Sequence, residues 1–163
     1  MSDEYYTPRP AWELLRPYIP KDKVVWECAW GTGQLAGWMR ADGYKVIGGP
    51  GVDFLTTSLE CDAIITNPPY SLTRDFLLRV QALGKPFAFL LPSEKLVPRS
   101  YHSIFEDLGM ELLIPDKRIN FNGPNCKGKA PAAFPTLWYC HRILPEKLIF
   151  KPLPLSTSGN STR

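Results

Sequence analysis

The stretch Ala63-Ile64-Ile65-Thr66-Asn67-Pro68-Pro69-Tyr70 indicates the fold of this chain more clearly than any other. An apolar run followed by two prolines marks the end of a buried strand, because proline cannot donate to a sheet ladder and fixes the backbone. Such a rigid turn suits a site that holds a flat ring against a polar side chain, and it leaves the Pro68 carbonyl free to accept a hydrogen bond. The alternative is a stiff strand-to-helix turn with a surface tyrosine.

Strand-like and helix-like segments alternate on both sides of this stretch. Strands are expected at residues 24–26, 44–47, 62–66, 87–91 and 111–114. Helices are expected at residues 35–39, 72–83 and 99–108, where apolar residues recur at helical spacing or a glycine closes the segment. This alternation predicts an α/β fold, a mostly parallel sheet with helices on both faces.

Size and composition bound the class of protein. At 163 residues, with 44% hydrophobic residues, the chain is expected to form one domain over residues 1–150, followed by a flexible tail at 151–163. No apolar stretch is long enough to span a bilayer, and the acidic start is unlike a secretory signal, so we expect a cytoplasmic protein without membrane contact. The cysteines, Cys28, Cys61, Cys126 and Cys140, are irregularly spaced. We expect reduced thiols, with no zinc site, other metal or disulfide framework.

The positive charge of the chain is concentrated in one late segment. Residues 116–142 carry five basic side chains and one acidic side chain, whereas the net charge of the whole chain is +3. Residues 120–135 read as a long loop rich in Asn, Gly, Pro and Lys, and the runs 117–119 and 136–140 could pair around it as antiparallel strands. A concentrated basic loop favours a phosphate-bearing partner such as nucleic acid. The alternative is a solvated loop with incidental lysines.

Two further motifs lie at expected strand ends, where parallel α/β sheets bind ligands. Residues 27–33, Glu-Cys-Ala-Trp-Gly-Thr-Gly, form a glycine turn that lets a ligand approach the backbone and a helix N-terminus. Asp53 could accept a hydrogen bond from an adenine amino group while Phe54 packs against the ring. A tight turn and a capping aspartate are the respective alternatives.

Together these motifs resemble the S-adenosylmethionine-dependent amino-methyltransferases that modify adenine N6 in DNA, most closely the compact phage-borne members. The resemblance runs from Tyr5 to Tyr139 and implies a Rossmann-like class I methyltransferase fold with seven strands and an antiparallel last strand. It rests on Thr7-Pro8, residues 27–33, Asp53-Phe54-Leu55, Asn67-Pro68-Pro69-Tyr70, Arg118-Ile119-x-Phe121 and Phe134-Pro135.

The resemblance also implies roles for individual residues. The implied catalytic residues are Asn67, Pro68, Pro69 and Tyr70. The residues implied to bind S-adenosylmethionine are Tyr6, Thr7, Pro8, Glu27, Cys28, Ala29, Gly31, Gly33, Asp53, Phe54 and Asn67. The residues implied to contact DNA, single- or double-stranded, are Lys117, Arg118, Phe121, Lys127, Lys129 and Phe134.

The residue types in the motif suit methyl transfer to an amino group. The adenine amino nitrogen is a poor nucleophile because its lone pair is delocalised into the ring. If the Asn67 side-chain oxygen and the Pro68 carbonyl accept its two N–H groups, the lone pair is freed for attack on the sulfonium methyl. Alignment and electrostatics then supply the rate. Tyr70 would stack on the extruded base.

The sequence departs from the family pattern at the end of the second expected strand. The family carries an acidic residue there to hold the cofactor ribose, whereas this chain has Ile47-Gly48-Gly49-Pro50-Gly51. Trp30 inside the glycine turn is also unusual, and could cover the cofactor or block part of its pocket. The chain has no room for a separate recognition domain, so little or short sequence specificity is expected.

Several alternatives stay open at this stage. A similar motif occurs in enzymes that methylate guanine N2 in RNA or glutamine in proteins. A different class is a degenerate, non-catalytic homologue that binds nucleic acid or a protein partner, which the Gly48-Gly49-Pro50 stretch favours. The resemblance to phage-borne members suggests a protein encoded by a phage or mobile element in a bacterial host, and a homo-oligomer is left open.

Overall fold

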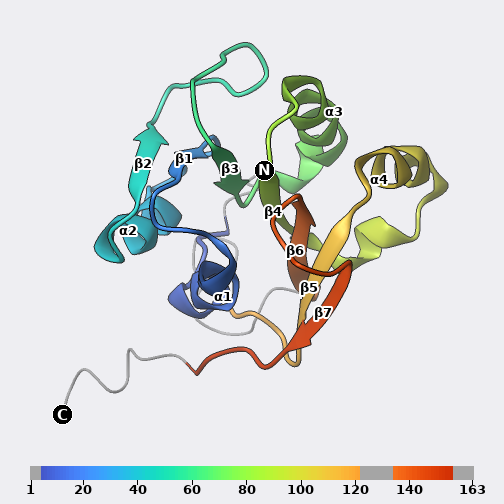
Figure 1. The fold of residues 1–163 in the computed structure, drawn as a ribbon. Coiled ribbons are helices and arrows are strands. Elements are labelled where there is room, and N and C mark those ends of the chain that lie inside the picture. The colour runs from blue at the N-terminus through green and yellow to red at the C-terminus, as the bar shows by residue number, and fades with distance from the viewer. Residues whose placement is uncertain (1–4, 122–133, 156–163) are drawn as a thin grey trace.

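The strands of this chain form one seven-stranded sheet in the order β2-β1-β3-β4-β6-β5-β7 (Figure 1). The computed structural model describes residues 5–121 and 134–155. The strands are β1 (Val24–Glu27), β2 (Lys45–Gly48), β3 (Ala63–Thr66), β4 (Phe87–Pro92), β5 (Glu111–Pro115), β6 (Thr136–His141) and β7 (Leu148–Lys151). The α-helices are α1 (Arg9–Leu15), α2 (Gln34–Ala41), α3 (Thr73–Leu83) and α4 (His102–Leu108). Short 3-10 helices are η1 (Arg16–Tyr18), η2 (Tyr70–Leu72), η3 (Ser93–Leu96) and η4 (Arg99–Tyr101).

The sheet is mostly parallel, as the sequence predicts. Strands β1 to β4 pair in parallel, and β6 runs antiparallel between β4 and β5. The expected antiparallel strand is therefore present as β6, but it is not the last strand of the chain, because β7 adds in parallel along β5. The hairpin expected between residues 117–119 and 136–140 does not form. Residues 117–119 are not in a strand, and β6 takes both its partners from β4 and β5.

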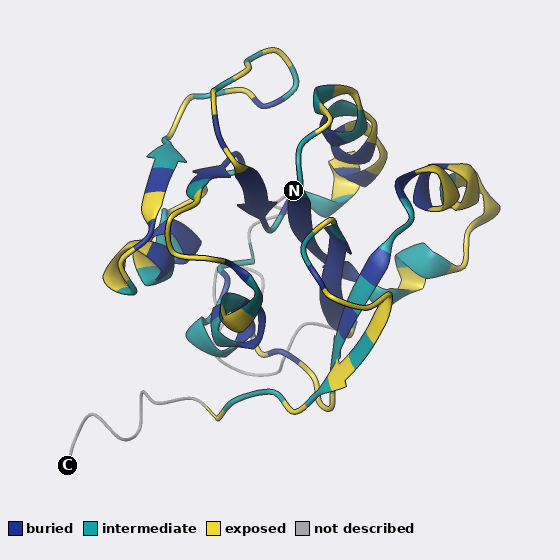
Figure 2. Cartoon of the chain, viewed as in Figure 1, coloured by how far each residue is buried: buried dark blue, intermediate teal, exposed yellow. Residues whose placement is uncertain are grey.

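Helices cover both faces of the sheet, and alternate strand residues build one core on each face. On one face α1 and α2 pack against residues such as Val25, Ala88 and Leu90. On the other face α3 and α4 pack against residues such as Trp26 and Phe89. Figure 2 shows the central strands buried and the outer sides of α3 and α4 exposed. The strict alternation along β1 and β4 is what a strand covered on both faces requires.

Helix α1 has no counterpart among the helices expected from the sequence. Pro8 is its N-cap residue and Pro10 stands in its first turn, where a missing backbone N–H costs nothing. Its apolar side chains Ala11, Trp12, Leu14 and Leu15 are fully buried. No helix among residues 5–121 and 134–155 is long and apolar enough to cross a membrane. Lys151 ends β7, and the remainder of the expected tail from residue 156 lies outside the described residues.

The topology gathers the sequence motifs at one edge of the sheet. Glu27, Gly48 and Thr66 end the parallel strands β1, β2 and β3, so the turns that follow them lie side by side. Because β6 runs antiparallel, its first residue Thr136 pairs with Pro92 at the carboxyl end of β4. The chain therefore enters β6 at the same edge at which β1, β3 and β5 end.

Candidate functional site

A pocket of about 350 Å³ opens at the carboxyl ends of β1, β2 and β3. Four segments contribute most of its walls: residues 5–7, residues 27–32, residues 49–52, and Asn67 with Pro69. The volume lies in the range of small-molecule sites, and the position beyond the strand ends is where α/β sheets bind ligands. The site predicted at the strand ends therefore corresponds to a real cavity.

The N-terminal wall, residues 5–7, is held firmly at Thr7. The Thr7 carbonyl accepts hydrogen bonds from Nε2 of Gln34 at 2.8 Å and from Nε1 of Trp38 at 2.9 Å, both on α2. Thr7 is buried, and Tyr6 and Thr7, both predicted to bind the cofactor, line the pocket. Pro8, also predicted to bind the cofactor, is not among the pocket residues and instead begins α1.

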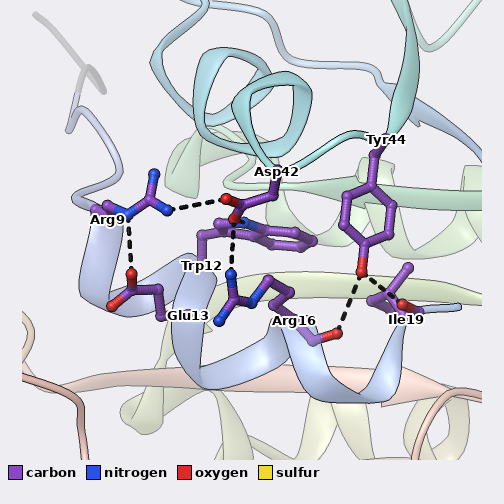
Figure 3. A network of polar contacts seen from close by, with 7 residues as sticks. All are labelled: Arg9, Trp12, Glu13, Arg16, Ile19, Asp42 and Tyr44. Carbon is purple, nitrogen blue, oxygen red and sulfur yellow. Dashed lines mark hydrogen bonds and ion pairs between the residues drawn. The ribbon is translucent and has the colours of Figure 1, made fainter. Parts of the chain in front are cut away.

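A polar network centred on Asp42 fixes α1 against the end of α2 (Figure 3). The Asp42 carboxylate accepts from Nη2 of Arg9 at 2.9 Å and from Nε1 of Trp12 at 2.8 Å, and it pairs with Nη1 of Arg16 at 3.3 Å. Burial acts to raise the Asp42 pKa, but the hydrogen bonds from Trp12 and Arg9 and the charges of Arg9 and Arg16 outweigh it, so the pKa is lowered. The network therefore fixes the position of α1, and with it the point from which residues 5–7 extend along the pocket.

Glu27 lies at the floor of the pocket with its carboxyl group buried. Its Oε1 accepts the backbone N–H of Ala29 at 3.0 Å and the hydroxyl of Thr66 at the end of β3. Burial raises the Glu27 pKa to about 8, and the two hydrogen bonds only partly offset that effect. Glu27 is therefore a carboxyl group poised to titrate near neutral pH, a feature of functional sites.

Some residues of the glycine turn line the pocket, and others hold the surrounding structure in place. Cys28, Ala29 and Gly31, predicted to bind the cofactor, line the pocket, and the space beside Gly31 is open. Burial, and then the Glu27 charge, raise the Cys28 pKa, so its thiol stays neutral and is no nucleophile. Gly33 is not a pocket residue; it caps α2. Trp30 lines the pocket while its ring packs under the Arg40 guanidinium, 5.1 Å from the ring centroid.

The end of β2 offers no carboxylate to the pocket. Gly48 has φ +121°, and a Cβ there would lie 2.5 Å from the Glu27 carbonyl oxygen, so a side chain at this position would clash. Gly49, Pro50 and Gly51 line the pocket in its place. Among the pocket residues Glu27 is the acidic one. The acidic residue that the family pattern has at this position is therefore missing from the pocket wall as well.

Asp53 and Phe54 are not among the residues that line the pocket, and their predicted contact with a cofactor adenine stays a prediction. Phe54 is 2% exposed and packs against Trp26 and Phe76, with ring centroids 5.3 and 4.9 Å away. Asp53 Oδ1 caps the following turn by accepting the N–H of Leu55 at 3.0 Å. The capping alternative therefore describes Asp53, and the pocket wall at this point is the preceding residue, Val52.

Asn67 is the polar residue of the proline turn, and its amide is held in one orientation. Its Nδ2 donates to the Tyr5 carbonyl at 2.7 Å, which turns Oδ1 the other way. Oδ1 is buried and has no hydrogen-bond partner among the described residues, and Asn67 lines the pocket. A buried acceptor left in this state costs about 1–3 kcal/mol. Pro68 is buried and Pro69 lines the pocket.

Four aromatic rings gather beside Asn67. Tyr5 stacks on Tyr70 with centroids 5.7 Å apart and an angle of 19° between the planes. Phe134 meets both rings edge-on, each at 5.4 Å, and Phe121 meets Tyr5 edge-on at 5.9 Å. Phe121, Phe134 and Tyr70 were predicted to lie near a base. Tyr5 was given no role by the sequence, although its position two residues before Thr7 places it next to a predicted cofactor contact.

The predicted basic contacts are only partly described by the structure. Lys117 and Arg118 are exposed and lie between β5 and Phe121. Lys127 and Lys129 lie outside the described residues. Among the described residues, no group of three or more His, Cys, Asp or Glu side chains is arranged to hold a metal ion, and Cys28, Cys61 and Cys140 are buried free thiols.

Comparison with known proteins gives a fold but no close relative. No protein-family model and no curated protein matches the sequence. Among solved structures, the chain is similar to a candidate RNA methyltransferase from Pyrococcus horikoshii, with 18% identity, 86% of this chain and 88% of that chain covered, and a TM-score of 0.58. It is also similar to a candidate class I S-adenosylmethionine-dependent methyltransferase from Listeria monocytogenes, with 12% identity, 99% and 70% covered, and a TM-score of 0.63.

A third similarity is to the modification subunit of a candidate type I restriction enzyme from Vibrio vulnificus. The identity is 15%, 98% of this chain and 51% of that chain are covered, and the TM-score is 0.57. The sheet order, the helices on both faces and these similarities together define the class: the protein has the Rossmann-like fold of class I S-adenosylmethionine-dependent methyltransferases. The expected fold is confirmed.

Proposed function

We propose that this protein transfers a methyl group from S-adenosylmethionine to the N6 amino group of adenine in DNA. The observation that carries the proposal is the Asn67 side-chain oxygen, which is buried at the pocket and has no hydrogen-bond partner among the described residues. Folded proteins rarely leave such an acceptor unused. An amino group that arrives with the substrate would satisfy it.

The residues of the pocket fit S-adenosylmethionine. The open space beside Gly31, Gly49 and Gly51 lets a ligand approach the backbone closely. Glu27 offers a carboxyl group near a ligand that carries a positively charged sulfur. Tyr6, Thr7, Cys28 and Ala29 would complete the wall around it. When bound, S-adenosylmethionine supplies an electrophilic methyl group and needs no metal.

The chain's own residues would then orient the acceptor. Asn67 Oδ1 accepts one N–H of the amino group and the Pro68 carbonyl accepts the other, which frees the nitrogen lone pair from the ring. With the donor bound, the nitrogen would be placed to take the methyl group as the bond from that methyl to sulfur breaks, and it would then release one proton to water. Tyr70 packs against the face of the ring. Positioned hydrogen-bond acceptors of this kind act mainly through alignment and electrostatics.

DNA is proposed as the substrate because aromatic rings gather beside Asn67 and two exposed basic residues shortly precede one of these rings in the sequence. Tyr70, Phe121 and Phe134 supply ring faces and edges for an extruded base. Lys117 and Arg118 are exposed next to Phe121, where phosphate groups would pass. In line with the sequence expectation, we propose little or short sequence specificity.

A second candidate is a non-catalytic homologue that binds nucleic acid or a protein partner. The observation that favours it is the end of β2, where Gly48 leaves no room for a carboxylate and Gly49 to Gly51 line the pocket. Losing such a ribose contact would weaken cofactor binding by roughly ten- to a hundredfold. Calorimetric titration of S-adenosylmethionine, with and without DNA, separates the two candidates, because the non-catalytic homologue would show no binding.

The decisive experiment supplies methyl-labelled S-adenosylmethionine together with DNA, RNA or protein in separate reactions. The proposal expects label in DNA, recovered after nuclease digestion as N6-methyladenine by mass spectrometry. Label in guanine of RNA, or in glutamine of a protein, would keep the methyltransferase class and overturn the DNA assignment. Absence of label from all three, together with absence of cofactor binding in the calorimetric titration, would favour the non-catalytic candidate.

A further inference from the structure

The face of Tyr70 that a substrate ring would use is covered by another residue of the same chain. Tyr5 lies on Tyr70 in a stacked arrangement, with centroids 5.7 Å apart and planes 19° from parallel. A ring inserted between them would need about 7 Å, twice the roughly 3.5 Å separation of stacked carbon atoms. Tyr5 and a third ring therefore compete for the same face.

Two independent contacts hold Tyr5 in this place. Its carbonyl accepts Nδ2 of Asn67 at 2.7 Å, and its ring is edged by Phe134 at 5.4 Å and by Phe121 at 5.9 Å. The hydrogen bond also fixes Asn67 with Oδ1 toward the site. The Tyr5 ring thus fills a flat niche. The ring of Tyr70 forms one wall of this niche, and Phe121 and Phe134 border it edge-on.

The ring of Tyr5 can leave Tyr70 while the backbone of the N-terminal wall stays in place. Two residues further on, the Thr7 carbonyl is fixed by Gln34 and Trp38, and α1 beyond it is fixed by the Asp42 network (Figure 3). Tyr6, between Tyr5 and Thr7, is in a β-bridge, so the backbone is held here as well. The Tyr5 side chain is half-buried, and its ring is held by aromatic contacts. Rotation of the Tyr5 side chain about its Cα–Cβ bond would therefore uncover Tyr70 and leave the backbone of residues 5–7 in place.

We propose that Tyr5 is a gate that imitates the substrate ring: it fills the niche of Tyr70, Phe121 and Phe134 until an extruded base displaces it. This inference rests on the proposed function for the nature of the incoming ring. The gate favours bases that are already unstacked or held out by the rest of the complex, because a stacked base cannot compete for the niche. It also keeps Asn67 oriented when no substrate is present.

The experiment measures binding of a single-stranded oligodeoxynucleotide that contains one 2-aminopurine, whose fluorescence falls when it stacks on tyrosine. Wild type, Tyr5→Ala, Tyr5→Phe and Tyr18→Ala are compared. Tyr18 is a matched control on the N-terminal segment, since its ring lies under Lys151 and away from the pocket. Removing the competing ring is expected to tighten binding roughly three- to tenfold in Tyr5→Ala. Tyr5→Phe and Tyr18→Ala should match wild type within about twofold.

Weaker quenching and weaker binding in Tyr5→Ala would overturn the gate, because Tyr5 would then be a substrate contact. Equal binding of wild type and Tyr5→Ala would also overturn it. A second measurement places 3-fluorotyrosine at position 5 and follows its ¹⁹F resonance. Displacement predicts that the oligodeoxynucleotide moves the resonance toward its value in the Tyr70→Ala variant, and an unmoved resonance contradicts the gate.

Failure of the gate and failure of the proposed function give different results. If Tyr5→Ala binds 2-aminopurine more tightly but no methyl label enters DNA, the gate stands and the methylation proposal fails. If label enters DNA while the resonance at position 5 stays unmoved, methylation stands and the gate fails. If neither wild type nor any variant quenches 2-aminopurine, both the gate and the DNA base as substrate are overturned.

Discussion

The hydroxyl group of Thr66 donates a hydrogen bond to Oε1 of Glu27, and this bond joins the ends of the neighbouring strands β3 and β1 at the floor of the pocket. The same oxygen accepts the Ala29 N–H at 3.0 Å, so one carboxyl oxygen organises both the strand ends and the glycine turn. Because the group is buried, its ionisation couples the pH of the solution to both the fold and the pocket.

Stability should therefore depend on pH through Glu27. The folded protein keeps the Glu27 proton between its ordinary pKa of 4.5 and its raised pKa of about 8, whereas the unfolded chain releases it. The folded state binds more protons in this window, so the free energy of unfolding falls as pH rises from about 4.5 to 8 and levels off above. Its slope should reach at most about 1.4 kcal/mol per pH unit.

Urea titrations at several pH values in this window measure the effect. Glu27→Gln removes the ionisable group and should flatten the pH dependence relative to wild type. Glu60→Gln removes an exposed carboxyl group and should keep the wild-type slope. Parallel curves for wild type and Glu27→Gln would show that Glu27 does not carry the dependence.

Glu27 should also discriminate between the methyl donor and its product. S-Adenosylmethionine carries a positive sulfur and S-adenosylhomocysteine does not, so the ionised carboxylate favours the donor more. As pH rises toward the Glu27 pKa of about 8, the ratio of donor affinity to product affinity should increase, on the order of tenfold between pH 6.5 and 8.5. Calorimetric titration with both ligands gives the ratio, and Glu27→Gln should make it independent of pH.

Asn67 should be needed for chemistry far more than for folding. Asn67→Ala removes the acceptor proposed for the amino group and should lower methyl transfer roughly a hundred- to a thousandfold. Its free energy of unfolding should change by only about 1 kcal/mol, since the lost bond to Tyr5 is offset by removal of a buried unsatisfied oxygen. Gln81→Ala removes an amide from α3 as a control and should transfer methyl groups normally. An active Asn67→Ala enzyme would refute the proposed role.

How far the sequence predicts this structure depends on how local the signal is. Strand β3 and its proline turn could be predicted because the apolar run and the two prolines that end it are adjacent in the sequence. Helix α1 could not, because Pro10 is one of its seven residues, Pro8 and Pro17 lie close to its ends, and its stability comes from burial of Trp12 and from the distant Asp42. Strand β7 is short, and its pairing with β5 is set by tertiary contacts.

The candidate site shows the same limit in its side chains. Glu27 and Asn67 could be predicted because Glu27 ends β1 and Asn67 directly follows β3, at the edge of the sheet where ligands bind. Phe54 could not be placed, because the sequence does not tell which side of the turn faces the pocket, and burial against Trp26 and Phe76 decides it. Tyr5 meets Asn67 across 62 positions of sequence, a contact that only the folded chain reveals.

Asp42 should be a main support of the N-terminal wall. Asp42→Ala leaves Trp12 Nε1, Arg9 and Arg16 without their shared acceptor, and should lower the free energy of unfolding by about 2–3 kcal/mol. The lowered Asp42 pKa means that this stabilisation is present above the ordinary carboxyl pKa and is lost as pH falls through the lowered value. Asp107→Ala, an exposed site on α4, is the control for urea titration near neutral pH. Equal losses for both variants would contradict a structural role of the network.

Lys127 and Lys129 should contribute to DNA affinity through phosphate contacts. Each cation that neutralises a phosphate adds about 0.7–0.9 to the slope of log affinity against log salt, depending on whether the DNA is single- or double-stranded. The double variant Lys127→Gln/Lys129→Gln should therefore bind more weakly at low salt and reduce the slope by about 1.4–1.8. The matched control is Lys21→Gln/Lys23→Gln, which removes two exposed charges just before β1, at the edge of the sheet opposite the pocket. Fluorescence anisotropy of labelled DNA across a salt series measures both slopes. If the two double variants change the slope equally, the effect is one of net charge, and residues 127 and 129 make no specific contact with phosphate.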